Sequence, residues 1–95
     1  MLVQHKQEGN RGIFFIAGED NEVEAELVYS LQHPRLIAEH TEVDEELRDQ
    51  NRGFELVNAL VKFARTHHLK IVPLCPFVKS VMDKKPDFGD VLSDK

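Results

Sequence analysis

The sequence predicts an α/β fold of the α+β kind, in which one mixed, mostly antiparallel sheet carries a βαβ unit and a C-terminal helix. Three observations predict this class. Apolar and polar residues alternate with a period of two over residues 23–31, as in a half-buried strand. An apolar stripe with helical spacing begins at Gly53, and a short apolar segment follows over residues 70–75. A chain of 95 residues and 10.9 kDa has the size of one domain, so we expect a single domain over residues 1–95.

Four strands are expected before the helix. Residues 13–17 form an apolar run between two glycines, and the polar turn that follows favours a hairpin with the strand at 23–31. A shorter strand is expected near residues 3–7. Because proline has a fixed φ and cannot donate to a strand ladder, Pro34 ends the alternation, and a new strand is expected at 36–43. Such short connections predict antiparallel neighbours.

The predicted helix has apolar side chains on one side and should end near His67. The apolar strand expected at 70–75 completes a strand–helix–strand unit, so it should run parallel to the strand at 36–43. A final helix is expected over residues 76–85, because proline at its first position suits the first turn. Residues 87–95 are expected to be irregular.

Charge and cysteine content limit the classes of function. The chain has 12 basic and 17 acidic side chains, a net charge of -5, without the basic excess typical of nucleic-acid binding. The single cysteine, Cys75, cannot close an intramolecular disulfide, and the adjacent His67 and His68 lack the i, i+4 spacing that chelates a metal. No apolar run reaches the roughly 18 residues that span a bilayer. We therefore expect a cytoplasmic protein, a monomer or weak homodimer, without metal, nucleic-acid or membrane partners.

Residues 43–53 connect a predicted strand to the N-terminus of the predicted helix. Such a turn offers unpaired backbone amides and the positive end of the helix dipole, which favour a phosphate or pyrophosphate. Arg48 and Gly53 also stand at the first and last positions of the pattern Gln/Arg-x-x-Gly-x-Gly/Ala. The segment therefore resembles the acetyl-coenzyme A signature of the GCN5-related N-acetyltransferases.

The resemblance extends over roughly residues 36–88, where the sequence is similar in detail to the small YjdJ-like subfamily of these enzymes. The matching positions are residues 40–43, 47–48, 56–57, 64–65, 69–70 and 73–78. The resemblance implies a minimal acetyltransferase fold, with acetyl-coenzyme A as acyl donor and a small amine or a protein or peptide amine as acceptor. It also implies that the strand backbone around Glu42 and Val43 pairs with the pantetheine arm. The implied cofactor-binding residues are Val43, Arg48, Gln50, Asn51, Arg52, Gly53 and Phe54.

Two positions depart from the family pattern, because Asp49 and Asn51 stand where the family usually has glycine. Asn51 can adopt the left-handed backbone conformation that glycine favours. Residues 42–52 carry five acidic side chains and two arginines, a local charge of -3 that opposes a phosphate. Further along the helix, Lys62 and Arg65 either reach a 3′-phosphate or belong to a solvated helix face.

Cys75 is a candidate catalytic residue at the end of the last predicted strand, directly before Pro76. A helix N-terminus at this point favours the thiolate and so lowers the pKa of the thiol. In the implied fold the thioester lies nearby. Cys75 therefore accepts the acyl group, protonates the departing thiolate, or is a small buried hydrophobe.

His40 and Glu42 are candidates for the base that deprotonates the amine acceptor. They share one face of their predicted strand because side-chain direction repeats every two residues. A histidine with a pKa near neutral, oriented by a carboxylate, suits this role, and a histidine that only hydrogen-bonds within the sheet fits equally well. The only tyrosine, Tyr29, lies on the predicted core face of its strand and offers no tyrosine acid.

Two functional hypotheses follow. The first is a small acetyl-coenzyme A-dependent N-acetyltransferase that transfers an acetyl group to an amine. The second is a catalytically impaired module on the same fold, which binds coenzyme A or another protein and is motivated by Asp49 and Asn51. Binding and turnover of acetyl-coenzyme A separate the two.

Overall fold

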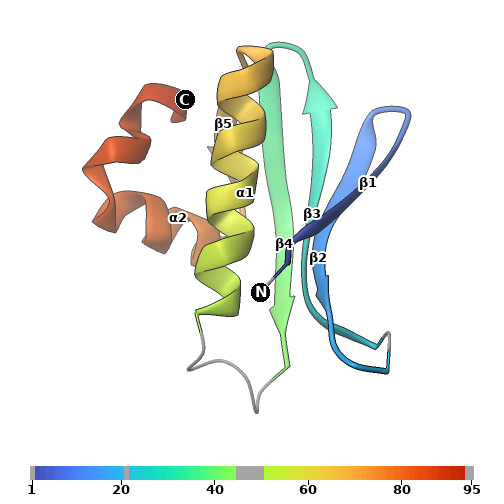
Figure 1. Cartoon of the computed structure of the whole chain (residues 1–95). Coiled ribbons are helices and arrows are strands. Elements are labelled where there is room, and N and C mark those ends of the chain that lie inside the picture. Colours follow the sequence, from blue (N-terminus) through green and yellow to red (C-terminus); the bar gives the residue numbers. More distant parts are fainter. Residues whose placement is uncertain (1, 21, 45–50, 94–95) are drawn as a thin grey trace.

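The computed structural model describes residues 2–20, 22–44 and 51–93. Within these ranges lie one five-stranded sheet, two α-helices and a 3-10 helix (Figure 1). The strands are β1 (Gln4–Glu8), β2 (Arg11–Ala17), β3 (Val23–Gln32), β4 (Arg35–Val43) and β5 (Lys70–Pro73). The helices are α1 (Arg52–His67), α2 (Pro76–Lys84) and the 3-10 helix η2 (Pro86–Val91).

The strands lie across the sheet in chain order, β1-β2-β3-β4-β5. The first four are antiparallel neighbours, whereas β4 and β5 run parallel and are joined through α1. The predicted α/β class, with its mixed sheet and βαβ unit, is therefore confirmed. The ends of the predicted strands differ from the observed ones by one or two residues.

The helices and the sheet enclose one hydrophobic core, with α1 lying along the sheet and α2 and η2 beside it (Figure 1). The apolar stripe of α1 faces β2, β3 and β4, as its helical spacing predicts. Burial of this apolar surface is the main source of stability in the fold. The largest fully buried side chains are Tyr29, Leu27, Leu36, Leu56, Leu60, Leu69, Ile71, Val57, Val61 and Val78.

The segment after α2 is more ordered than its sequence predicts. The expectation of an irregular tail is wrong over residues 87–91, which belong to η2. Phe88 and Val91 are only 6% and 3% exposed, and their spacing of three residues places them on one side of a 3-10 turn. The backbone amide of Ser93 then donates to the carbonyl of Ile71 on β5 at 2.8 Å. The tail is ordered because it covers the edge of the core beside β5.

β4 contains a bulge opposite β3. Val28 pairs with His40, while the next residue, Tyr29, pairs with Ala38. Glu39 is therefore an extra residue in β4 that has no counterpart across the ladder. A bulge of this kind bends its strand and increases the local twist.

The bulge also changes which side chains of β4 face the helices. Ala38, before the bulge, is fully buried in the core. After the bulge, Thr41 and Val43 lie on the helix side, where Val43 packs against the core. His40 and Glu42 then point to the opposite, open face of the sheet, because neighbouring side chains of a strand alternate.

Candidate active site

The pairing between β4 and β5 stops in the middle of β4. Residues 35–38 pair with residues 70–73, and the amides of Leu74 and Cys75 both donate to the carbonyl of Ala38, at 3.1 and 3.0 Å. Beyond this point the chain turns into α2, whereas β4 continues to Val43. Among the described residues no strand pairs with the second half of β4 on the side away from β3, so the sheet is open there.

A cavity of about 460 Å³ lies at this opening, between β4, the N-terminus of α1 and α2. Its walls are mainly apolar, and its polar groups come from the hydroxyl of Thr41, the side chain of Asn51 and the backbone. Such a site suits a long, mostly apolar ligand with polar groups at defined points. We call it the β4–α2 pocket. Its lining residues are Thr41, Val43, Asn51, Gly53, Phe54, Phe77 and Val81.

The ring of Phe77 packs directly on Gly53. A Cβ atom placed on Gly53 would lie 2.5 Å from Cζ and 2.8 Å from Cε2 of Phe77, which is much closer than any ordinary contact. Phe77 is 41% exposed, which is unusual for a phenylalanine. The absence of a side chain at Gly53 thus allows α2 to approach the first turn of α1, and the ring forms the outer wall of the pocket.

The N-terminus of α1 begins at Asn51, which has a left-handed backbone with a φ of 60° and makes no side-chain cap hydrogen bond. Asn51 thus has the left-handed conformation that an asparagine can adopt in place of glycine. Next to it, Nε of Arg52 donates to Oε1 of Glu24 on β3 at 3.0 Å. The two side chains are 16% and 25% exposed, so this ion pair is largely shielded from solvent. A carboxylate thus neutralises one of the predicted phosphate-binding cations.

Cys75 is the N-cap residue of α2 and is 6% exposed. Its Sγ donates to Oγ1 of Thr41 at 3.4 Å, so the thiol lies directly behind a side chain that lines the pocket. Burial acts to raise the pKa of Cys75. When the thiol loses its proton, the hydroxyl of Thr41 can donate to the thiolate in turn, and the backbone amides of Val78, Phe77 and Thr41 also stabilise it, so the pKa is lowered. The structure thus brings Cys75 to the pocket through Thr41.

His40 and Glu42 lie together on the open face of β4. Nε2 of His40 is 3.1 Å from Oε1 of Glu42, and the two side chains are 55% and 70% exposed. Neither residue lines the β4–α2 pocket. The two candidate bases therefore form a pair, as predicted, on the face of the strand that looks away from Cys75.

A second cavity, of about 430 Å³, lies beside β3 and β4 at the same end of the sheet. Thr41 and Val43 line both cavities, so the two meet at the second half of β4. The charged side chains around the second cavity are all acidic. Its lining residues are Val23, Glu24, Ala25, Glu26, Thr41, Glu42, Val43 and Asp44.

Comparison with known proteins identifies the family. Residues 13–91 match the family model described as GCN5-related N-acetyl-transferase. The chain belongs to this family. No protein of curated function matches the sequence significantly. The predicted acetyltransferase family is therefore confirmed, while the narrower YjdJ-like subfamily stays a prediction.

Solved structures of GCN5-related proteins share the fold. A GCN5-like protein from Staphylococcus aureus is 33% identical with a TM-score of 0.75, over 95% of this chain and 87% of that one. Nourseothricin acetyltransferase is 25% identical with a TM-score of 0.60, over 68% of this chain and 40% of its own length. Ribosomal-protein-alanine N-acetyltransferase from Brucella melitensis biovar Abortus 2308 is 16% identical with a TM-score of 0.62, over 94% of this chain and 67% of that one. The last likeness concerns the fold alone.

Part of the phosphate-binding turn that the family resemblance predicts lies outside the described residues. Arg48, Asp49 and Gln50 belong to this part. In the described ranges no group of three or more histidine, cysteine, aspartate or glutamate side chains could hold a metal ion. No helix of these ranges is long and apolar enough to cross a membrane.

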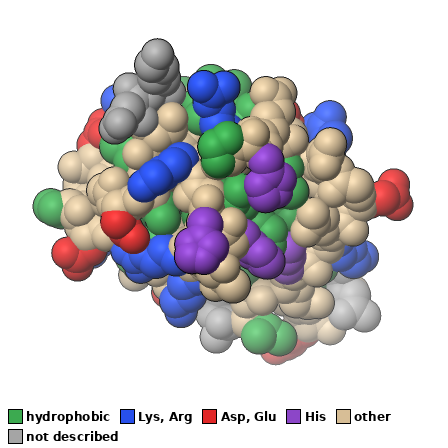
Figure 2. Space-filling model, turned by 90° about the horizontal axis from the view of Figure 1, so that it is seen from above, with side chains coloured by type: hydrophobic (Ala, Val, Ile, Leu, Met, Phe, Trp, Pro, Cys, Tyr) green, Lys and Arg blue, Asp and Glu red, His purple; other side chains and the backbone are tan. Residues whose placement is uncertain are grey.

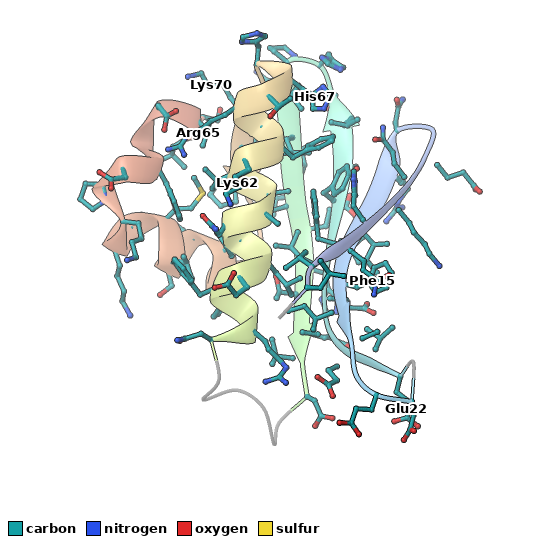
Figure 3. All side chains as sticks on the ribbon, viewed as in Figure 1. Phe15, Glu22, Lys62, Arg65, His67 and Lys70 are labelled. Atoms are coloured by element: carbon teal, nitrogen blue, oxygen red, sulfur yellow. The ribbon has the colours of Figure 1, made fainter. Side chains whose placement is uncertain are left out.

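Lys62 and Arg65 lie far from the N-terminus of α1. Arg65 lies thirteen positions after Arg52, which corresponds to about 20 Å along a helix. Figure 3 shows Arg65 directed toward η2, where its guanidinium donates to both carboxylate oxygens of Asp90 at 2.9 Å and to the carbonyl of Asp87 at 2.7 Å. This bond lowers the pKa of Asp90. The structure therefore favours a surface role for Arg65 over contact with a 3′-phosphate, and the side chain of Lys62 is likewise exposed.

His5 contributes to an aromatic cluster that the sequence does not reveal. Its Nε2 lies 2.6 Å from the hydroxyl of Tyr29, and its ring stacks on Phe14 with 4.2 Å between centroids. On α1, the ring of Phe63 contacts both His5 and His67, so His67 belongs to the same cluster. The cluster lies at the end of the molecule where histidines gather in Figure 2. Burial, and then the neighbouring His67, lower the pKa of His5. Tyr29 is fully buried, as predicted, and does not face the pocket.

Proposed function

We propose that the protein is a small acetyl-coenzyme A-dependent N-acetyltransferase that transfers an acetyl group to an amine. The observation that carries this proposal is the opening of the sheet after Ala38, with the thiol of Cys75 held behind the pocket wall at Thr41. Membership of the family supports the choice of acyl donor. The small size and mainly apolar lining of the pocket suit a pantetheine arm rather than a bulky ring system.

The backbone of β4 would hold the pantetheine arm. The amide of Asp44 donates to the carbonyl of Glu24 on β3, so alternation along the strand directs the backbone groups of Thr41 and Val43 away from β3 and toward the opening. The amide of Thr41 also hydrogen-bonds the sulfur of Cys75, so an amide of the arm can pair with the carbonyl of Thr41 and with Val43 as a further strand would. Backbone amides at the N-terminus of α1, together with the predicted Arg48, Gln50 and Arg52, would meet the pyrophosphate.

Cys75 would act as an acid through Thr41. When the amine nitrogen attacks the thioester carbonyl, the carbon–sulfur bond breaks and its electron pair leaves with the thiolate of coenzyme A. The hydroxyl of Thr41 would donate its proton to that sulfur and take one from the Cys75 thiol. The remaining Cys75 thiolate is stabilised by the amides of Phe77 and Val78, and it regains a proton from solvent.

The amine would approach from the open face of the sheet. It must lose a proton before it attacks, and the pair His40 and Glu42 lies on that face beside the opening. The acidic cavity shares Thr41 and Val43 with the pocket, so a cationic amine would be attracted to the reacting carbonyl. We therefore propose His40, oriented by Glu42, as the base for an amine that enters from this side.

Calorimetric titration with acetyl-coenzyme A tests the proposal, together with an assay of free coenzyme A in the presence of a polyamine or a lysine peptide. We expect binding with 1:1 stoichiometry, turnover with at least one amine, and a strong loss of turnover but not of binding in Cys75→Ala and Thr41→Val. Mass spectrometry of the wild type should show no stable acetyl group on Cys75. An acetylated Cys75 would replace the acid role by covalent transfer, and no binding at millimolar ligand would refute the proposal.

A specific observation also favours the second hypothesis, a module that binds without turnover. Glu24 already engages Arg52 at the N-terminus of α1, and further carboxylates line the neighbouring cavity. These charges oppose a pyrophosphate and reduce affinity. Binding of coenzyme A without release of product from any amine, in conditions where the wild type is folded, would favour this second function.

A further inference from the structure

We propose that the acceptor amine is the lysine side chain of a polypeptide, and that apolar side chains near this lysine dock on Ile13, Phe15 and Val28 of the open sheet face. We call these three residues the open-face patch. The inference rests on the proposed function for its activity readout, and it deepens that function by naming the class of acceptor. The docking site itself is tested by binding alone.

The open-face patch lies on the side of the sheet opposite the hydrophobic core. Phe14 and Leu27 are buried in the core, so alternation along β2 and β3 directs Ile13, Phe15 and Val28 to the other face. In the described part of the chain, both α-helices add their apolar side chains to the core face. The three patch residues are partly exposed. Adjoining apolar side chains that remain in contact with solvent are stabilised when a partner covers them.

One row of cross-strand neighbours joins the patch to the proposed base. Ile13 pairs with Val28 on β3, and Val28 pairs with His40 on β4. Neighbouring strands lie about 4.8 Å apart, so the backbone of Ile13 is about 10 Å from that of His40. An extended polypeptide advances about 3.3 Å per residue. A peptide that holds its lysine at His40 therefore reaches Val28 and Ile13 with side chains two or three positions away, whereas a small amine leaves them uncovered.

A second row supplies charges that favour a basic acceptor. Phe15 pairs with Glu26 on β3, and Glu26 pairs with Glu42 on β4. Within the ranges that the structure describes, no cation forms an ion pair with Glu26. A cation already lies on the aromatic ring of this row, because Nζ of Lys6 is 5.4 Å from the ring centroid of Phe15. The row therefore suits an ammonium group next to apolar side chains, which is the chemistry of a lysine-containing polypeptide segment.

Two matched peptides test the docking. Each carries one acceptor lysine; the first has leucine two and three positions away on both sides, and the second has serine there. We expect the wild type to use the leucine peptide with a kcat/KM about 10-fold higher. The difference should lie in KM, because apolar docking adds binding without changing the reacting atoms. The small amine n-butylamine, which cannot reach the patch, should be used no better than the serine peptide.

Val28→Ser removes the centre of the patch, and Val72→Ser is its matched control. Val72 is also a partly exposed valine in a strand, but it lies on β5, on the other side of β4 from the patch. We expect Val28→Ser to reduce the preference for the leucine peptide from about 10-fold to about 2-fold, while Val72→Ser keeps it. Phe15→Ser is a second variant and should act as Val28→Ser does. All three variants should keep the wild-type turnover of n-butylamine, which reports folded protein with intact chemistry.

The two proposals fail in different ways. If no amine is acetylated, the proposed function fails, and titration of both peptides into isotope-labelled protein still tests docking through the amide shifts of Ile13, Phe15 and Val28. Equal kcat/KM for the two peptides, or an unchanged preference in Val28→Ser and Phe15→Ser, overturns the inference. If these variants change the sedimentation coefficient while the preference stays, the patch joins two copies of the chain, and the inference is overturned as well.

Discussion

The contact between Gly53 and Phe77 predicts that alanine in place of glycine lowers the free energy of unfolding, although this replacement usually stabilises a helix. Replacement Gly53→Ala adds a Cβ only 2.5 Å from Cζ of Phe77, whereas carbon atoms prefer separations of about 3.5–4.0 Å. The ring must therefore withdraw by about 1 Å. Phe77 is 41% exposed, so it can move outward, but it then loses part of its packing on α1.

The magnitude follows from two opposing terms. Overpacking of this kind costs about 1–3 kcal/mol, while alanine in place of glycine stabilises a helix by up to about 1 kcal/mol. We expect Gly53→Ala to lower the free energy of unfolding by about 0–2 kcal/mol in the wild type. In a Phe77→Ala background the collision is absent, so the same replacement should raise the free energy of unfolding by about 0.5–1 kcal/mol.

Urea unfolding of the four proteins, followed by circular dichroism, measures this double-mutant cycle. Equal m-values across the set show that the variants unfold between comparable states. Leu74→Ala serves as the control background, because Leu74 is 65% exposed and lies outside the pocket lining. If Gly53→Ala has the same effect, in sign and size, with and without the Phe77 ring, the added methyl group does not collide with that ring.

Further predictions concern pH, packing and thiol reactivity. Because the pKa of His5 is lowered in the folded state, the unfolded chain binds the proton more readily. The contribution of His5 to stability should therefore be full above pH 6.5 and should decrease as the pH falls below 6.5. His5→Gln should reduce the change in urea midpoint between about pH 7.5 and pH 5. Gly12→Ala would place a Cβ 2.2 Å from the hydroxyl of the fully buried Tyr29, so it should destabilise the protein by about 1–3 kcal/mol or more, and an unchanged midpoint would contradict the packing. Thr41→Val removes a hydrogen bond that lowers the pKa of Cys75, so the alkylation rate of the thiol should rise at higher pH than in the wild type; an unshifted profile would show that Thr41 does not influence the thiol.

The order and type of the elements follow from local sequence signals. The alternation over residues 23–31 and the helical stripe from Gly53 both reflect periods of the backbone itself, which any neighbouring structure must accommodate. The proline at residue 76 marks the start of α2 for the same kind of local reason. The tail was harder to predict, because Phe88 and Val91 are ordered by contacts with a core built from distant residues.

The candidate site could be predicted only in part. Cys75 was expected at the N-terminus of a helix because the proline after it is a local signal, and the structure places it there. The sequence does not reveal which face of the sheet carries His40 and Glu42. The bulge at Glu39 reverses the direction of the later side chains, and it depends on pairing with β3. A strict period of two would have directed both toward the core with Ala38.

The sequence by itself determined the class of fold, the family and the residues near the opening of the sheet, because periodicity, turn chemistry and short motifs are local properties of the chain. Only the tertiary structure decided how these residues are arranged. The bulge divides β4 into two faces, the loss of pairing with β5 opens the pocket, and Phe77 reaches its wall because Gly53 has no side chain. Each of these features depends on contacts between segments far apart in the sequence, which the spacing of residues along one strand or helix does not record.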